Sequence, residues 1–141
     1  MNYIDTFVAV AEDCPVSHSV VPESKADKKR SVAAIQYELL AENPYELTPE
    51  DVLFQTHVLH KQVPADELKA RGVAMREDFF AQPQPCLRTS PLARKYGWGF
   101  HFDGAGKVAL YPVGSSEYRQ FSGDTSGSTS QHLKAFRSSR D

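Results

Sequence analysis

The chain has 141 residues, a formal net charge of −2 and a hydrophobic fraction of 40%. This length suits a single domain, and the composition is ordinary for a globular protein rather than a disordered one. The nearly balanced charge gives no general attraction to nucleic acid or to anionic lipid, so we expect neither as a partner. No apolar run reaches the ~18 residues of a membrane span, and the first residues do not have the pattern of a signal peptide. With only two cysteines, the sequence predicts a cytoplasmic protein with reduced thiols.

The first predicted element is a strand at 3–11. Thr6 and Val8 share one face of this strand, and Phe7 and Ala9 share the other. Both faces are largely apolar, which is typical of a strand covered on both sides. We therefore expect it to lie in the centre of a sheet.

Three helices are predicted next, at 28–42, 49–60 and 64–81. Apolar residues recur at helical spacing in the first, and Asn43 with the following proline ends it. Thr48 and Pro49 suit the cap and the first position of the second helix. Residues 52–60 would also fit a strand, because they are rich in β-branched and aromatic side chains.

A β-hairpin is predicted at 97–113, with its turn in the DGAG segment at 103–106. A two-residue turn is expected there, and it fixes which side chains share a face. One face would carry Trp98, Phe100, Phe102, Lys107, Ala109 and Tyr111, and the other Gly97, Gly99, His101, Val108, Leu110 and Pro112. The glycines indicate that another group approaches the second face closely. Which face belongs to the core stays open.

These elements predict an α+β fold with a single globular domain at 1–122. A small antiparallel or mixed sheet, formed by the N-terminal strand and the 97–113 hairpin, would carry about three helices. A short further helix is expected near 115–120. Residues 123–141 are rich in Gly, Ser and Thr and then basic, so a flexible tail is expected there. The exposed edge of the hairpin could pair with a second copy, which leaves a homodimer possible.

Several segments together resemble an uncharacterised family of small bacterial proteins, a domain of unknown function. The segments that carry the resemblance are NY (2–3), TF (6–7), VAEDCP (10–15), IQYELL (35–40), NPY (43–45), DVLF (51–54), PCLR (85–88), SPL (90–92), YGWG (96–99), ALY (109–111) and EY (117–118). The resemblance spans the chain to about residue 122. It implies a cytoplasmic single-domain protein, and it implies no particular activity.

Cys14 and Cys86 each lie beside a proline, within two of these segments. A cysteine nucleophile needs a lowered pKa and a base within reach, and His101 is the candidate base. Free cysteines are more commonly small packing residues of the interior. The sequence leaves open whether the protein is an enzyme that uses Cys14 or Cys86 with His101.

Cys14, His18, His57 and His60 could in principle supply four zinc ligands. Their spacing matches no zinc motif, and histidines on a helix surface explain the pattern equally well. We expect no metal and no other cofactor.

The leading hypothesis is a small binding or interaction domain with a site for a small anionic ligand. Basic residues precede the aromatic hairpin, and an arginine beside exposed rings can bind such a ligand through charge and stacking. The residues predicted for this site are Arg88, Arg94, Trp98, His101 and Tyr111. An ordinary core beside an ordinary surface gives the same pattern.

Overall fold

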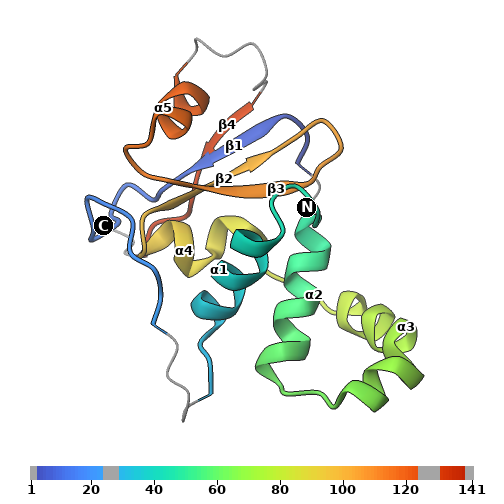
Figure 1. Ribbon diagram of the computed structural model, residues 1–141. Coiled ribbons are helices and arrows are strands. Elements are labelled where there is room, and N and C mark those ends of the chain that lie inside the picture. Colours follow the sequence, from blue (N-terminus) through green and yellow to red (C-terminus); the bar gives the residue numbers. More distant parts are fainter. Residues whose placement is uncertain (1–2, 24–28, 124–130, 139–141) are drawn as a thin grey trace.

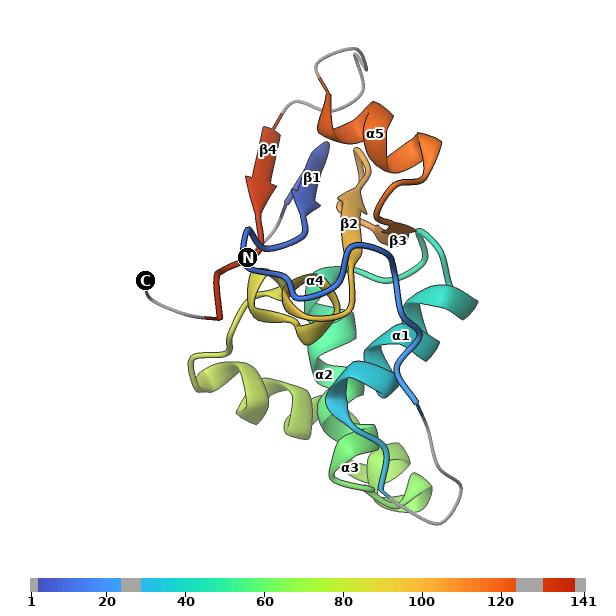
Figure 2. The ribbon, with the colours of Figure 1, turned by 90° about the vertical axis from the view of Figure 1, so that its left-hand side faces the viewer.

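A four-stranded mixed sheet separates two layers of helices in the computed structural model, which describes residues 3–23, 29–123 and 131–138 (Figure 1). The strands are β1 (Thr6–Ala9), β2 (Trp98–Phe102), β3 (Val108–Pro112) and β4 (Gln131–Lys134). Their order is β3-β2-β1-β4, with β1 and β4 parallel and the other pairs antiparallel. Figure 2 shows β4 and β3 at the two edges. The predicted α+β class is confirmed.

Helices cover the two faces of the sheet unequally. The face that we call the inner face packs against α1 (Val32–Glu42) and α4 (Pro91–Arg94), with α2 (Pro49–His60) behind α1. The opposite face, called the outer face, carries only α5 (Ser116–Ser122) in the described part of the chain. A 3-10 turn, η1 (Leu87–Thr89), precedes α4. No helix among the described residues is long and apolar enough to cross a membrane.

The central position predicted for the N-terminal strand is confirmed. β1 lies between β2 and β4, and both Phe7 and Val8 are buried although they point to opposite faces. Val8 joins the inner core with Phe100 and Phe102. Phe7 instead packs edge-on against Tyr118 of α5, with ring centroids 5.0 Å apart.

The hairpin is confirmed, but its predicted facing is wrong. The Asp103 amide donates to the Lys107 carbonyl over 2.9 Å, so the loop between them has three residues rather than two. Gly106 closes this loop with a φ of 78°, in the left-handed region that glycine adopts without strain. The extra residue turns each side chain of β3 to the opposite face. Tyr111 therefore shares the outer face with His101.

The three main helices lie where the sequence predicts them, with small differences at their ends. α1 begins at Val32 rather than near 28, because the Ser31 hydroxyl accepts the Ala34 amide and caps it. α2 has a complete capping box, in which Thr48 and Asp51 accept each other's amides. Residues 52–60, where a strand was the alternative, are helical.

Part of the predicted flexible tail belongs to the sheet. Gln131–Lys134 form β4 and pair in parallel with β1, whereas residues 124–130 and 139–141 lie outside the described residues. The short strand has Leu133 as its one large apolar side chain, so its sequence carries little strand signal. At the opposite edge, residues 45–47 hydrogen-bond to Val108 and cover part of β3.

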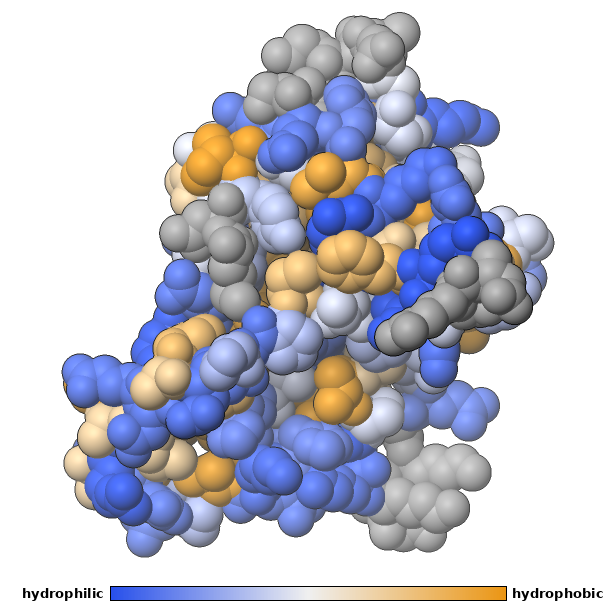
Figure 3. All heavy atoms as spheres, turned by 180° about the vertical axis from the view of Figure 1, so that it is seen from behind, coloured by the Kyte–Doolittle hydropathy of each residue, from blue (hydrophilic) through white to orange (hydrophobic). Residues whose placement is uncertain are grey.

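The helix α3 (Ala65–Ala81) stands apart from the sheet, and none of its residues is buried. It contacts α2 through the ring of Phe79, which lies 5.8 Å from the ring of Phe54, and through an ion pair between Arg76 and Asp51. Val73 is 78% exposed. Seen from behind, this end of the molecule mixes apolar and hydrophilic side chains (Figure 3, lower left).

We predict that Gly99→Ala destabilises the fold by about 1–3 kcal/mol, the usual cost of overpacking. A Cβ at Gly99 would lie 2.7 Å from Phe7 Cζ and 2.8 Å from Tyr118 Cε2, so the outer layer must shift. The matched control is Gly104→Ala in the hairpin loop, where the nearest atom, an Asp5 carboxylate oxygen, lies 3.5 Å away. Urea unfolding of both variants makes the measurement. Equal stability of the two would contradict this packing.

Candidate functional site

The structure does not bring together the five residues predicted to bind an anionic ligand. Trp98 lies on the inner face, where its ring packs 5.2 Å from that of Tyr37 and its Nε1 donates to the Val20 carbonyl. His101 and Tyr111 lie on the outer face. The sheet therefore separates Trp98 from these two residues.

Among the described residues, neither arginine of the predicted site has a hydrogen bond or cation–π contact with the hairpin aromatics. Arg94 is on α4, where its Nη1 reaches the Thr89 carbonyl at 3.5 Å. Arg88 belongs to η1 and lies beside the end of β4, with its Nε donating to the Lys134 carbonyl over 2.7 Å. Only His101 and Tyr111 of the five form a common cluster in the described structure.

The cluster on the outer face is built around Tyr45. Its hydroxyl lies 2.9 Å from His101 Nδ1 and 2.8 Å from the Tyr111 hydroxyl. Phe121 of α5 stacks on the imidazole at 3.9 Å between ring centroids. Burial lowers the pKa of His101 and raises that of Tyr45, so both side chains are neutral near pH 7. His101 is 6% exposed, and its Nε2 has no partner among the described residues.

Neither cysteine forms the predicted pair with His101. Cys86 lies on the inner side of the sheet beside Tyr3, whose pKa is raised to about 12 by burial and by a hydrogen bond with that thiol. Cys14 follows β1 in a turn closed by a hydrogen bond from its amide to the Ala11 carbonyl. No hydrogen bond in the described ranges joins either sulfur to His101. The His101 imidazole instead hydrogen-bonds to Tyr45 and stacks against Phe121.

The outer face is open beside α5, along β1 and β4, and forms a groove of about 420 Å³. Phe7 and Ala9 of β1 form its apolar floor, and His132 and Lys134 are their register partners on β4. Arg88 also lines this groove. The remaining lining residues are Ser122 and Leu133. We call this feature the basic groove, because three of its seven described lining residues can carry positive charge and none of these seven is acidic.

Arg88 is held in place within the basic groove. Its guanidinium carbon lies 4.3 Å from the centroid of the Phe136 ring, and its Nε is bonded to β4. The Phe136 amide in turn donates to the Arg88 carbonyl. These contacts fix the plane of the guanidinium, and its terminal nitrogens have no hydrogen bond within the described ranges. A fork of this kind suits a carboxylate or a phosphate.

Lys134, the second cation of the groove, has a carboxylate partner at the surface. Its Nζ lies 3.0 Å from Glu12 Oε1, and both side chains are more than half exposed. A hydrogen bond from Lys134 and its charge lower the pKa of Glu12. Such exposed pairs are weak, so the lysine remains available to another anion.

Sequence reasoning identified Arg88 but missed the other cations of the groove. His132 and Lys134 lie in the segment predicted to be a flexible tail, and they enter the groove only because β4 pairs with β1. The basic residues near the C-terminus were the available signal.

A family model described as a family of unknown function (DUF6157) matches residues 1–141. The chain belongs to this family. The match confirms the resemblance to an uncharacterised family that the sequence segments indicated. Comparisons with curated proteins and with solved structures find no match. For this member of DUF6157, the geometry of the described residues therefore carries the functional argument.

We predict that the protein loses stability as the pH falls from about 7.5 to 5.5. Burial lowers the pKa values of His101 and His57 below the ordinary value of about 6.5, so the unfolded chain takes up protons that the folded chain does not. The contribution of these histidines to stability is full above their pKa in the unfolded chain. It decreases as the pH falls toward their lower pKa in the folded protein. Urea unfolding across this range makes the measurement.

The variant His101→Phe is expected to flatten this pH dependence in part, and His132→Gln on exposed β4 serves as the matched control. The slopes with pH are compared rather than the absolute stabilities, because His101→Phe also removes the Tyr45 hydrogen bond. If His101→Phe keeps the wild-type slope, His101 is not neutral in the folded protein.

Proposed function

We propose that the protein is a small binding domain whose basic groove takes an anionic ligand with a short apolar portion. The observation that carries the proposal is the combination of Arg88, His132 and Lys134 around an apolar floor. A volume of about 420 Å³ is in the range of small-molecule sites. The cytoplasmic location expected from the sequence is part of the same proposal, supported by two free thiols.

Recognition in this groove would divide between charge and apolar contact. The fork of Arg88 would bind the anionic group through two parallel hydrogen bonds, and Lys134 would add a point charge. The apolar part of the ligand would contact Ala9, which β1 presents at the floor of the groove beside the buried Phe7 ring. Hydrogen bonding to the charged group sets the orientation, and the floor adds affinity.

The test is a titration of the protein with phenyl phosphate, in which binding is measured by calorimetry and by NMR. We expect Arg88→Gln to weaken binding by about 10- to 100-fold, the value of a lost charge-assisted hydrogen-bond pair. Arg88→Lys keeps the charge but not the fork, so it should also weaken binding. Binding should fall as salt is raised.

Lys69→Gln on exposed α3 is the matched control, because it removes one positive charge far from the groove. Thermal unfolding of each variant checks that β4 stays in the sheet. Wild-type affinity in Arg88→Gln, or equal weakening in Lys69→Gln, would refute binding in the basic groove.

A further inference from the structure

A second hollow lies on the other side of the sheet, among α1, α2 and the segment at 84–91. It has a volume of about 280 Å³. Its lining residues are Val32, Gln36, Leu53, Thr56, Phe79, Gln84, Pro85, Cys86, Thr89, Ser90 and Pro91. None of these residues is Lys, Arg, His, Asp or Glu. We call it the neutral cavity, and it shares no lining residue with the basic groove.

Buried polar side chains line the neutral cavity. Gln36 and Ser90 are each 4% exposed, and the Ser90 hydroxyl donates to Gln36 Oε1 over 2.6 Å. This bond occupies the carbonyl end of the Gln36 amide. Its nitrogen, with two N–H donors, has no hydrogen bond to the described residues. This nitrogen is therefore available to donate to an acceptor on a ligand in the cavity.

An acceptor is available at the other side of the cavity. Gln84 Nε2 donates to the Phe79 carbonyl over 2.8 Å, which leaves Gln84 Oε1 free to accept. Thr56 donates its hydroxyl to the Val52 carbonyl and keeps its lone pairs as acceptors. Val32 and Leu53 supply apolar surface. The cavity thus offers a donor, acceptors and an apolar wall, with no charge.

From these observations we propose that the neutral cavity binds an uncharged, flat molecule that carries an amide or lactam group. Its carbonyl would accept from the Gln36 amide nitrogen, and its N–H would donate to Gln84 or Thr56. An ion is disfavoured, because no lining side chain could neutralise it after it leaves water. This site is independent of the proposed function, since it lies on the opposite side of the sheet.

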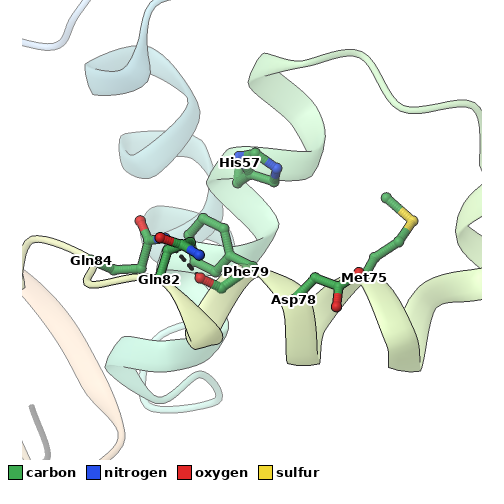
Figure 4. Close-up of a pocket in the computed structure, with 6 residues that line it drawn as sticks. All are labelled: His57, Met75, Asp78, Phe79, Gln82 and Gln84. Carbon is green, nitrogen blue, oxygen red and sulfur yellow. Dashed lines mark hydrogen bonds between the residues drawn. The ribbon is translucent and has the colours of Figure 1, made fainter.

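The cavity has an approach from solvent past α3. Phe79 and Gln84 line both the neutral cavity and a larger outer hollow of about 450 Å³. Figure 4 shows this outer hollow, with Phe79 between His57 of α2 and the chain that leads to Gln84. The Phe79 ring, which packs against the rings of Phe54 and His57, therefore lies between the two hollows.

Cys86 lines the cavity and allows its occupancy to be measured directly. The test follows modification of the thiols of the full chain by methyl methanethiosulfonate, with 2-pyridone as the probe at up to about 10 mM. We expect 2-pyridone to slow modification of Cys86 at least threefold. Cys14 is the internal control, since it is also half-buried but does not line the cavity, and its rate should not change.

Two further compounds test the chemical class. Toluene has a ring of similar size without the amide. Benzylammonium adds a positive charge to such a ring, and the basic groove would not compete for it because that groove is itself positively charged. Neither should protect Cys86. If toluene protects Cys86 as well as 2-pyridone does, the polar recognition is overturned. If benzylammonium protects it equally, the preference for an uncharged molecule is overturned. If 2-pyridone gives no protection, the site itself is overturned.

Variants assign the protection to the cavity. Gln36→Leu should abolish it, whereas Gln55→Leu, on α2 but outside the cavity, should keep it. If Gln36→Leu does not fold, Leu53→Phe fills the cavity without touching the Gln36–Ser90 pair and should abolish protection in its place. If 2-pyridone still protects Cys86 in the variant that folds, the assignment of its binding site to the neutral cavity is refuted. None of these outcomes bears on phenyl phosphate binding at Arg88, so the two proposals fail separately.

Discussion

The three-residue loop of the hairpin is the constraint on which the rest of the structure depends. The Asp103 carboxylate accepts the amides of Ala105 and Lys107, each over 2.9 Å, and Gly106 takes the left-handed conformation that closes the loop. A strand has a period of two, so the parity of this loop decides which side chains of β3 face α1 and which face α5. Val108 is thereby committed to the inner core and Tyr111 to the outer layer.

The outer layer is thin, and this leaves room for the basic groove. α5 has only seven residues and is held by a few rings, since the lack of a side chain at Gly99 lets the rings of Phe7 and Tyr118 pack directly over β2. Tyr45 strengthens the same layer from the edge of β3, at the cost of a φ of 59° that is rare for a side chain of this size. Since this helix covers only part of the outer face, the groove beside it stays open along β1 and β4, with Ala9 at its floor.

The sequence predicted what depends on neighbouring residues and missed what depends on distant ones. Capping at Thr48 and the doubly apolar pattern around Phe7 are local, and both predictions are confirmed. The turn at 103–106 is also local, but Asp-Gly-Ala-Gly fits loops of two or three residues, so the sequence does not decide which side chains of β3 face the core. β4 pairs with a strand about 125 residues earlier, which no local pattern reveals. Gln36 and Ser90 likewise meet across 54 positions, so their shared cavity was invisible in the sequence.

The most direct test is the register of the hairpin, because it decides which side chains of β3 face α1 and which pack beside α5. Side-chain NOEs in the labelled protein would measure it. The account predicts contacts of the His101 ring with both Tyr111 and Phe121, and of the Trp98 ring with Tyr37. NOEs that place the Tyr111 ring on the same face as the rings of Phe100 and Trp98 would contradict it, since that pattern requires a two-residue loop.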